Sequence, residues 1–139
     1  TIMHVSAENK TILVVDDDPD FRAAQQARLE AEGFTVAAAA TAAEAEGLLD
    51  EIEPDLMVVD LMMERMDSGF TLCYRAKKRR PAMPIVMVSA VRATTGIAFH
   101  ADTPEERSWV KADAFLSKPV RFEQLLAEID LLLSGAAAQ

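Results

Sequence analysis

The chain has 139 residues, enough for one domain with a hydrophobic core, and half of its residues are hydrophobic, which excludes a disordered protein. Its 23 acidic and 14 basic side chains give a formal charge of −9, so we expect no direct binding of nucleic acid, because phosphate contacts need a basic surface. No uncharged stretch approaches the roughly 20 residues of a membrane span. The single Cys73 excludes an intramolecular disulfide, and the N-terminus lacks a secretory signal, so we expect a cytoplasmic protein with no membrane partner.

A polar leader without hydrophobic periodicity occupies residues 1–10. The apolar run at residues 11–15 then predicts a buried strand, which leads into a row of aspartates. Asp18 and Pro19 predict the N-cap and the first position of a helix that ends at Gly33. The residues expected on one face of this helix are Phe21, Ala24 and either Ala27 or Arg28.

Residues 34–38 alternate weakly, which predicts a strand at the edge of a sheet. Thr41 predicts the cap of the next helix, and Pro54 follows its end. An apolar run of four residues ending in Asp60 then predicts a buried strand with a carboxylate at its end. The expected apolar face of the second helix comprises Ala42, Ala45, Leu48, Leu49 and Ile52.

The second half of the chain continues the alternation. A third helix is expected to start near Gly69 and to run to the basic cluster at residues 77–80. Residues 84–90 predict another buried strand, followed by a long irregular segment at residues 91–102. The cap, proline and acids of residues 103–106 then predict the start of a short helix.

The last expected strand lies within residues 113–119. The last helix has Phe122, Leu125, Leu126, Ile129, Leu132 and Leu133 at helical spacing. Strands that alternate with helices over residues 11–133 predict one α/β domain, a (βα)₅ unit with a parallel sheet covered on both faces. We expect residues 134–139 to form a frayed tail.

Four of the five expected strands end in polar or charged residues. Because the carboxyl ends of parallel strands share one edge of the sheet, these side chains should converge although they are far apart in the sequence. They are Asp16 and Asp17 after the first strand, Asp60 after the third, Ser89 after the fourth and Lys118 after the fifth.

This set of residues fits phosphoryl chemistry. Three carboxylates placed together repel, so one would be protonated unless a cation lay among them, and their oxygen atoms suit Mg²⁺. We expect Asp60 to attack a phosphorus atom and form an acyl phosphate, with Mg²⁺ held by Asp16, Asp17 and Asp60. Lys118 would pair with one phosphoryl oxygen, and the Ser89 hydroxyl would donate a hydrogen bond to another.

In this combination, Asp16-Asp17, Asp60, Ser89 and Lys118-Pro119 resemble the signature positions of the response-regulator receiver domain of two-component signalling. The resemblance implies a flavodoxin-like doubly wound fold with strand order 2-1-3-4-5. It implies that a sensor histidine kinase or a phosphotransfer protein donates the phosphoryl group. The domain would then be a signalling phosphoacceptor that switches conformation to control a partner or effector, rather than an enzyme.

The same resemblance implies three finer features. The backbone carbonyl of Met62 would also bind Mg²⁺, the Lys118–Pro119 peptide bond would be cis, and Phe115 would be the switch aromatic that turns inward when Ser89 moves.

The sequence departs from the family pattern in two places. After the acceptor strand, Glu64 stands where the family usually has proline, and Ser68 is inserted before the glycine. Ser89 and Lys118 are 29 positions apart, several more than in a typical receiver. We therefore expect a lengthened segment between the fourth strand and the fourth helix, and a helix that starts near Pro104.

Two other functions compete with this interpretation. Asp16 and Asp18 have the spacing of the nucleophile and general acid of a Mg²⁺-dependent aspartyl phosphatase, although Asp18 also suits a helix cap. A binding module that works without phosphorylation could use the same fold. The chain begins with Thr1, not Met, so a further effector domain, the cognate kinase and the oligomeric state all stay open.

Overall fold

The computed structural model describes residues 10–60, 66–89, 113–117 and 120–134. The elements in chain order are β1 (Thr11–Asp16), α1 (Pro19–Ala31), β2 (Thr35–Ala39), α2 (Ala42–Ile52), β3 (Leu56–Asp60), α3 (Met66–Arg79), β4 (Ile85–Ser89), β5 (Ala114–Ser117) and α6 (Phe122–Leu133). The segment expected at residues 91–102, the helix expected near Pro104 and most of the expected leader and tail lie outside the described residues.

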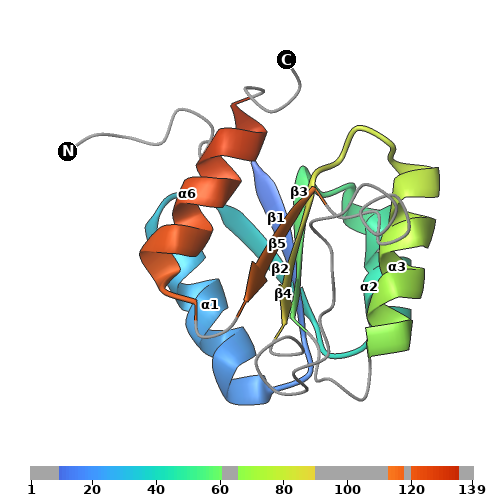
Figure 1. Cartoon of the computed structure of the whole chain (residues 1–139), viewed down its shortest axis with the longest axis horizontal. Helices are drawn as coiled ribbons and strands as arrows, with labels where there is room; N and C mark the ends of the chain where they lie inside the picture. Colours follow the sequence, from blue (N-terminus) through green and yellow to red (C-terminus); the bar gives the residue numbers. More distant parts are fainter. Residues whose placement is uncertain (1–9, 61–65, 90–112, 118–119, 135–139) are drawn as a thin grey trace.

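The strands form a parallel sheet in the order β2-β1-β3-β4-β5, which confirms the expected doubly wound topology. Helices α1 and α6 cover one face of the sheet, and α2 and α3 cover the other (Figure 1). The expected edge position of the second strand is also confirmed, because β2 pairs with β1 alone and its residues are mostly half-buried. In this arrangement β1 and β3 lie in the interior of the sheet.

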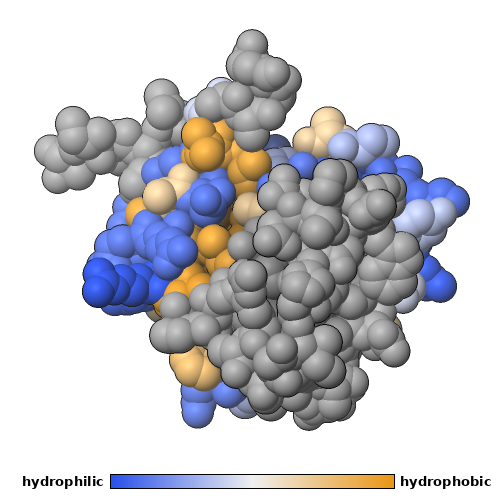
Figure 2. Space-filling view, viewed as in Figure 1, coloured by the Kyte–Doolittle hydropathy of each residue, from blue (hydrophilic) through white to orange (hydrophobic). Residues whose placement is uncertain are grey.

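The core consists of two hydrophobic layers, because successive side chains of a strand point to opposite faces of the sheet. The layer beneath α2 and α3 includes Leu13, Val15, Met57, Val59, Ile85, Met87, Leu49 and Leu72. The layer beneath α1 and α6 includes Ile12, Val14, Leu56, Val58, Val86, Val88, Leu29, Leu125 and Ile129. In the view of Figure 2, a band of hydrophobic residues lies beside the hydrophilic outer residues of the α1–α6 side.

Helix α1 starts where the sequence predicts, and it buries a different face from the one named there. Asp18 is the N-cap, with its carboxylate accepting from the backbone N–H groups of Asp20 and Phe21, and Pro19 is the first helical residue. Phe21 and its expected neighbours do share a face, but that face is exposed, with Phe21 57% accessible. Leu29 is the buried residue of the helix, because it reaches the layer shared with α6.

The ends of α1 and α2 follow the predicted capping chemistry. Gly33 follows α1 with φ 105°, a conformation that favours glycine. Thr41 caps α2 by accepting a hydrogen bond from the backbone N–H of Glu44, whose own carboxylate accepts from the N–H of Ala40. The α2 face predicted from the sequence is the face that contacts the core, with Ala45 and Leu49 fully buried.

The third helix begins earlier than expected. It starts at Met66, so Gly69 lies buried inside its first turn and not at its start. A glycine alone does not distinguish a helix start from a position one turn inside it, which explains the error. Among the described residues, no helix is both long and apolar enough to cross a membrane.

Candidate functional site

The ends of β1 and β3 place two carboxylates side by side. Asp16 is the register partner of Asp60, and adjacent strands lie about 4.8 Å apart. Both side chains are buried, with 1% and 3% of their surface exposed, and among the described residues they are the buried charged ones. Two neighbouring carboxylates in a buried position repel strongly, and a cation or hydrogen-bond donors must offset that repulsion.

The strand alternation decides which side of the sheet these carboxylates occupy. Asp16 lies on the same face of β1 as Ile12 and Val14, and Asp60 lies on the corresponding face of β3. The apolar residues on this face of the sheet belong to the hydrophobic layer beneath α1 and α6. The candidate site therefore opens toward the α1–α6 side of the sheet.

A pocket of about 540 Å³ lies on this side, and Asp60 forms part of its wall. Its described lining comes from α1 (Phe21, Ala24, Gln25, Arg28), from β4 (Val88) and from α6 and the residues just before it (Val120, Arg121, Phe122, Leu125). The Arg28 guanidinium lies 4.9 Å from the centre of the Phe122 ring, so a cation–π contact joins α1 to α6 beside the pocket. Asp60 therefore borders a pocket that lies between α1 and α6.

The turn from β1 into α1 is held by hydrogen bonds around Asp17. The backbone N–H of Asp18 donates to Asp16 Oδ1 at 2.9 Å. Arg22 Nη1 donates to the backbone carbonyl of Asp16, also at 2.9 Å. Asp17 itself is half-buried and directly follows Asp16. The structure thus brings the expected pair Asp16 and Asp17 to the same sheet edge as Asp60.

The remaining predicted residues are placed only through the backbone or not at all. Ser89 ends β4, one position beyond Val88, which is the register partner of Asp60. Phe115 lies in β5 opposite Met87. Met62, Lys118 and Pro119 lie outside the described residues, so their expected roles stay predictions.

The carboxylate oxygen atoms of this donor set are ligands that suit Mg²⁺. Within the described part of the chain, no group of three His, Cys, Asp or Glu residues is arranged closely enough to form a ready-made metal site. Mg²⁺ does not need one, because it usually keeps several waters and binds through one or two carboxylates plus phosphate oxygen. Asp16 and Asp60 supply such a pair, with Asp17 beside them.

A family model described as the response regulator receiver domain matches residues 12–130 of the chain. The chain belongs to the response regulator receiver domain family. Receiver domains are phosphoacceptor signalling domains of two-component systems, as the strand-end residues predict.

Three similar proteins illustrate the family. The DNA-binding dual master transcriptional regulator RpaA of Synechocystis sp. is 32% identical over 124 residues, which cover 88% of this chain and 48% of RpaA. A receiver domain protein (CheY-like) from Methanospirillum hungatei JF-1 has a TM-score of 0.73 at 31% identity, covering 90% of this chain and 94% of the other. TrrA of Thermotoga maritima, in complex with Mg(2+)-BeF, has a TM-score of 0.70 at 27% identity, covering 88% and 98%. This receiver domain thus spans about half the length of the curated relative and nearly all of both solved chains.

Sequence reasoning missed two features of this receiver domain. The pocket beside Asp60 combines residues from α1, β4 and α6, and no local pattern in the sequence indicates it. Arg22 carries a partial signal, because it lies four residues after the cap Asp18, a spacing that returns a side chain to the start of the helix.

Proposed function

We propose that this receiver domain accepts a phosphoryl group on Asp60 from a sensor histidine kinase or a phosphotransfer protein. The observation that carries the proposal is the register pairing of Asp16 with Asp60, which sets two buried carboxylates side by side at the carboxyl edge of the sheet. Asp60 also borders the pocket on the α1–α6 side of the sheet.

In the transfer step, a carboxylate oxygen of Asp60 forms a bond to phosphorus while the phosphorus–nitrogen bond of the donor phosphohistidine breaks. The electron pair of that bond leaves with the imidazole. Asp16, Asp17 and Asp60 would hold Mg²⁺, together with the backbone carbonyl of Met62. The bound ion would neutralise charge on the phosphoryl oxygens.

Two further residues complete the proposed set. Lys118 pairs with a phosphoryl oxygen as a point charge, and the Ser89 hydroxyl donates to another oxygen. Phe115 is the proposed switch aromatic, which turns inward when Ser89 moves toward the phosphoryl group. The presence of Mg(2+)-BeF in the similar TrrA structure supports a magnesium-dependent site of this kind.

The competing phosphatase function requires Asp18 as a general acid. Here the Asp18 carboxylate accepts hydrogen bonds from the backbone N–H groups of Asp20 and Phe21, at 2.9 and 3.3 Å, as the cap of α1. An acid committed to a helix cap is poorly placed to protonate a leaving group. We therefore propose that the chain catalyses only its own phosphorylation and dephosphorylation.

The output of the proposed switch is a protein partner or a linked effector. RpaA is named as a DNA-binding regulator, and this chain spans 48% of its length. With a formal charge of −9, the domain would act on DNA only through another domain or protein. The cytoplasmic location expected from the sequence is part of this proposal.

Phosphorylation with a small donor tests the acceptor directly. The protein is incubated with acetyl phosphate and Mg²⁺, and mass spectrometry is expected to show one added phosphoryl group, lost on treatment with hydroxylamine. Asp60→Asn should not be modified, whereas Asp50→Asn, the same change at an exposed position of α2, should be modified like the parent. Absence of any acyl phosphate, or modification of Asp60→Asn, would end the proposal.

A further inference from the structure

Arg22 holds the turn between β1 and α1 from both sides of Asp17. Its backbone N–H donates to the carbonyl of Asp18 at 2.9 Å, as the first helical hydrogen bond of α1. Its side-chain Nη1 donates to the carbonyl of Asp16 at 2.9 Å, in a partly buried position. One residue therefore fixes the carbonyls of both residues that flank Asp17.

The position of this contact explains why an arginine is useful there. The register of β1 with β2 ends at Val15, so Asp16 extends one residue beyond the last pair on that side of the strand. The guanidinium of Arg22 supplies a donor at the point where β2 no longer pairs. With Asp18 N–H bonded to Asp16 Oδ1, the turn has little freedom left around Asp17.

We propose that Arg22 is a positioning residue for the Mg²⁺ site. By holding the carbonyl of Asp16 and that of Asp18, it sets the direction in which Asp17 presents its carboxylate beside Asp16 and Asp60. The inference rests on the proposed function, in which Asp17 is a magnesium ligand. It adds a residue that binds neither the metal nor the phosphoryl group.

A positioning role and a purely electrostatic role predict opposite effects. A fixed cation near a magnesium site repels the ion, so loss of the Arg22 charge should by itself tighten Mg²⁺ binding. Loss of the Arg22 hydrogen bond should instead loosen the turn and weaken Mg²⁺ binding, as removal of a residue that orients a ligand usually does. The sign of the change therefore separates the two roles.

The test is a titration of the 139-residue chain with Mg²⁺ by isothermal titration calorimetry. We expect Arg22→Met to weaken Mg²⁺ binding about tenfold. Arg22→Lys should recover most of the affinity, because one carbonyl needs only one donor. Arg75→Met is the control: it removes the same charge from an exposed position of α3, where Arg75 pairs with Glu46 instead of contacting the turn, so its affinity should equal that of the parent.

A readout without metal separates positioning from general destabilisation. In Mg²⁺-free buffer, Arg22→Met should speed amide hydrogen exchange at residues 16–18 while leaving exchange in β3 unchanged. Should Arg22→Met fail to fold, Arg22→Gln, whose amide is too short to reach the Asp16 carbonyl, takes its place.

Two outcomes would overturn the inference. One is tighter or unchanged Mg²⁺ binding in Arg22→Met, and the other is an equal loss of affinity in Arg75→Met. Failure of the proposed function is distinguishable, because it appears in the parent chain, as absence of Mg²⁺ binding or of phosphorylation at Asp60.

Discussion

Asp113 and Ile85 hold each other by a reciprocal pair of hydrogen bonds at the start of β5 and β4. The backbone N–H of Asp113 donates to the carbonyl of Ile85, and the backbone N–H of Ile85 donates to the Asp113 carboxylate, both at 2.8 Å. Asp55 and Thr11 repeat the arrangement at the start of β3 and β1, again at 2.8 Å. An aspartate just before one strand thus fixes the first residue of its neighbour, at the sheet edge opposite the candidate site.

The first prediction concerns the stability that Asp113 provides. Its Oδ2 also lies 2.7 Å from Lys77 Nζ, and the same ammonium group donates to the carbonyl of Met83 at 2.9 Å. Asp113→Ala removes the acceptor for the Ile85 N–H, so we expect a loss of about 1–3 kcal/mol of unfolding free energy in urea denaturation. Asp113→Asn keeps an acceptor oxygen and should cost less. Equal losses in the two variants would show that the charge matters more than the acceptor.

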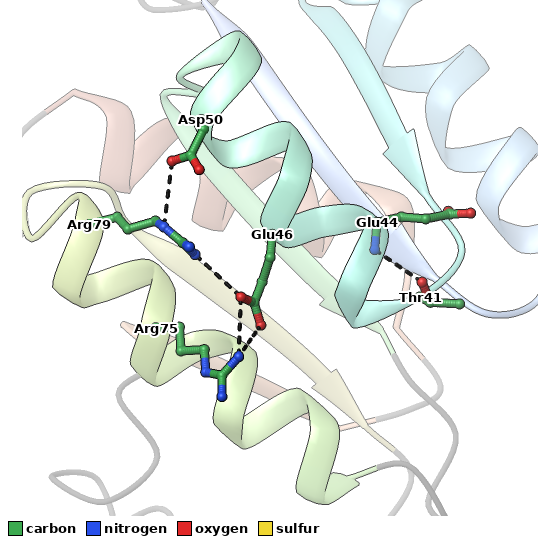
Figure 3. A network of polar contacts seen from close by, with 6 residues as sticks. All are labelled: Thr41, Glu44, Glu46, Asp50, Arg75 and Arg79. Carbon is green, nitrogen blue, oxygen red and sulfur yellow. Dashed lines mark hydrogen bonds and ion pairs between the residues drawn. The ribbon is translucent and has the colours of Figure 1, made fainter.

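The second prediction concerns the ion pairs between α2 and α3. Glu46 lies between two arginines of α3, with Arg75 Nη1 3.1 Å from Oε2 and Arg79 Nη1 3.4 Å from Oε1 (Figure 3). Because Arg75 is 57% exposed, we expect Glu46→Gln to lower the unfolding free energy by only about 0.5–1 kcal/mol. The loss should shrink as the salt concentration rises.

Asp50 provides the control for that measurement. It lies 3.5 Å from Arg79 Nε and its side chain is 67% exposed, so Asp50→Asn should change the unfolding free energy by less than about 0.5 kcal/mol. Thermal unfolding of both variants at low and high salt checks this. If Asp50→Asn lowered the unfolding free energy as much as Glu46→Gln, that would contradict the role of Glu46 as the partner of both arginines.

The third prediction concerns the reactivity of Cys73. Burial raises the pKa of the Cys73 thiol to about 12, Lys77 lowers the pKa and Asp113 raises it further. The thiol therefore stays protonated at neutral pH, and we expect the folded protein to react with a disulfide reagent only through unfolding. Labelling should be slow in buffer and rapid in urea, and a fast reaction in buffer would contradict the burial.

The same thiol makes stability depend on pH. The unfolded thiol ionises around its ordinary pKa of 9.0, whereas the folded thiol keeps its proton until about pH 12. The unfolded state therefore binds fewer protons between these values, and the contribution of Cys73 is lost as the pH rises from 9.0 toward 12. The fall should be smaller in Cys73→Ala, measured by urea denaturation across this range.

The fourth prediction separates the buried and exposed residues of α1. Leu29 is fully buried, so Leu29→Ala should cost about 2–5 kcal/mol of unfolding free energy. Phe21 is 57% exposed, and Phe21→Ala should cost less than about 1 kcal/mol. Urea denaturation of both variants measures these two losses of unfolding free energy. The reverse order would contradict the burial of Leu29 and the exposure of Phe21.

The sequence by itself determined the order and type of the described elements, because caps and hydrophobic runs act over a few residues. Asp18 and Thr41 signal the starts of α1 and α2, and both form the expected caps. The continuous apolar run before Asp60 predicts an interior strand with a carboxylate at its end, and β3 has that form. From such strand ends, the sheet edge that carries the candidate site could be predicted.

Only the tertiary structure decided how those strand ends meet. The pairing of Asp16 with Asp60 depends on the register between two strands separated by α1, β2 and α2, which no local pattern specifies. The same holds for the burial of Leu29 and the exposure of Phe21, and for the contact between Arg22 and the Asp16 carbonyl. These features follow from packing between distant segments, where the position of each side chain depends on the whole sheet.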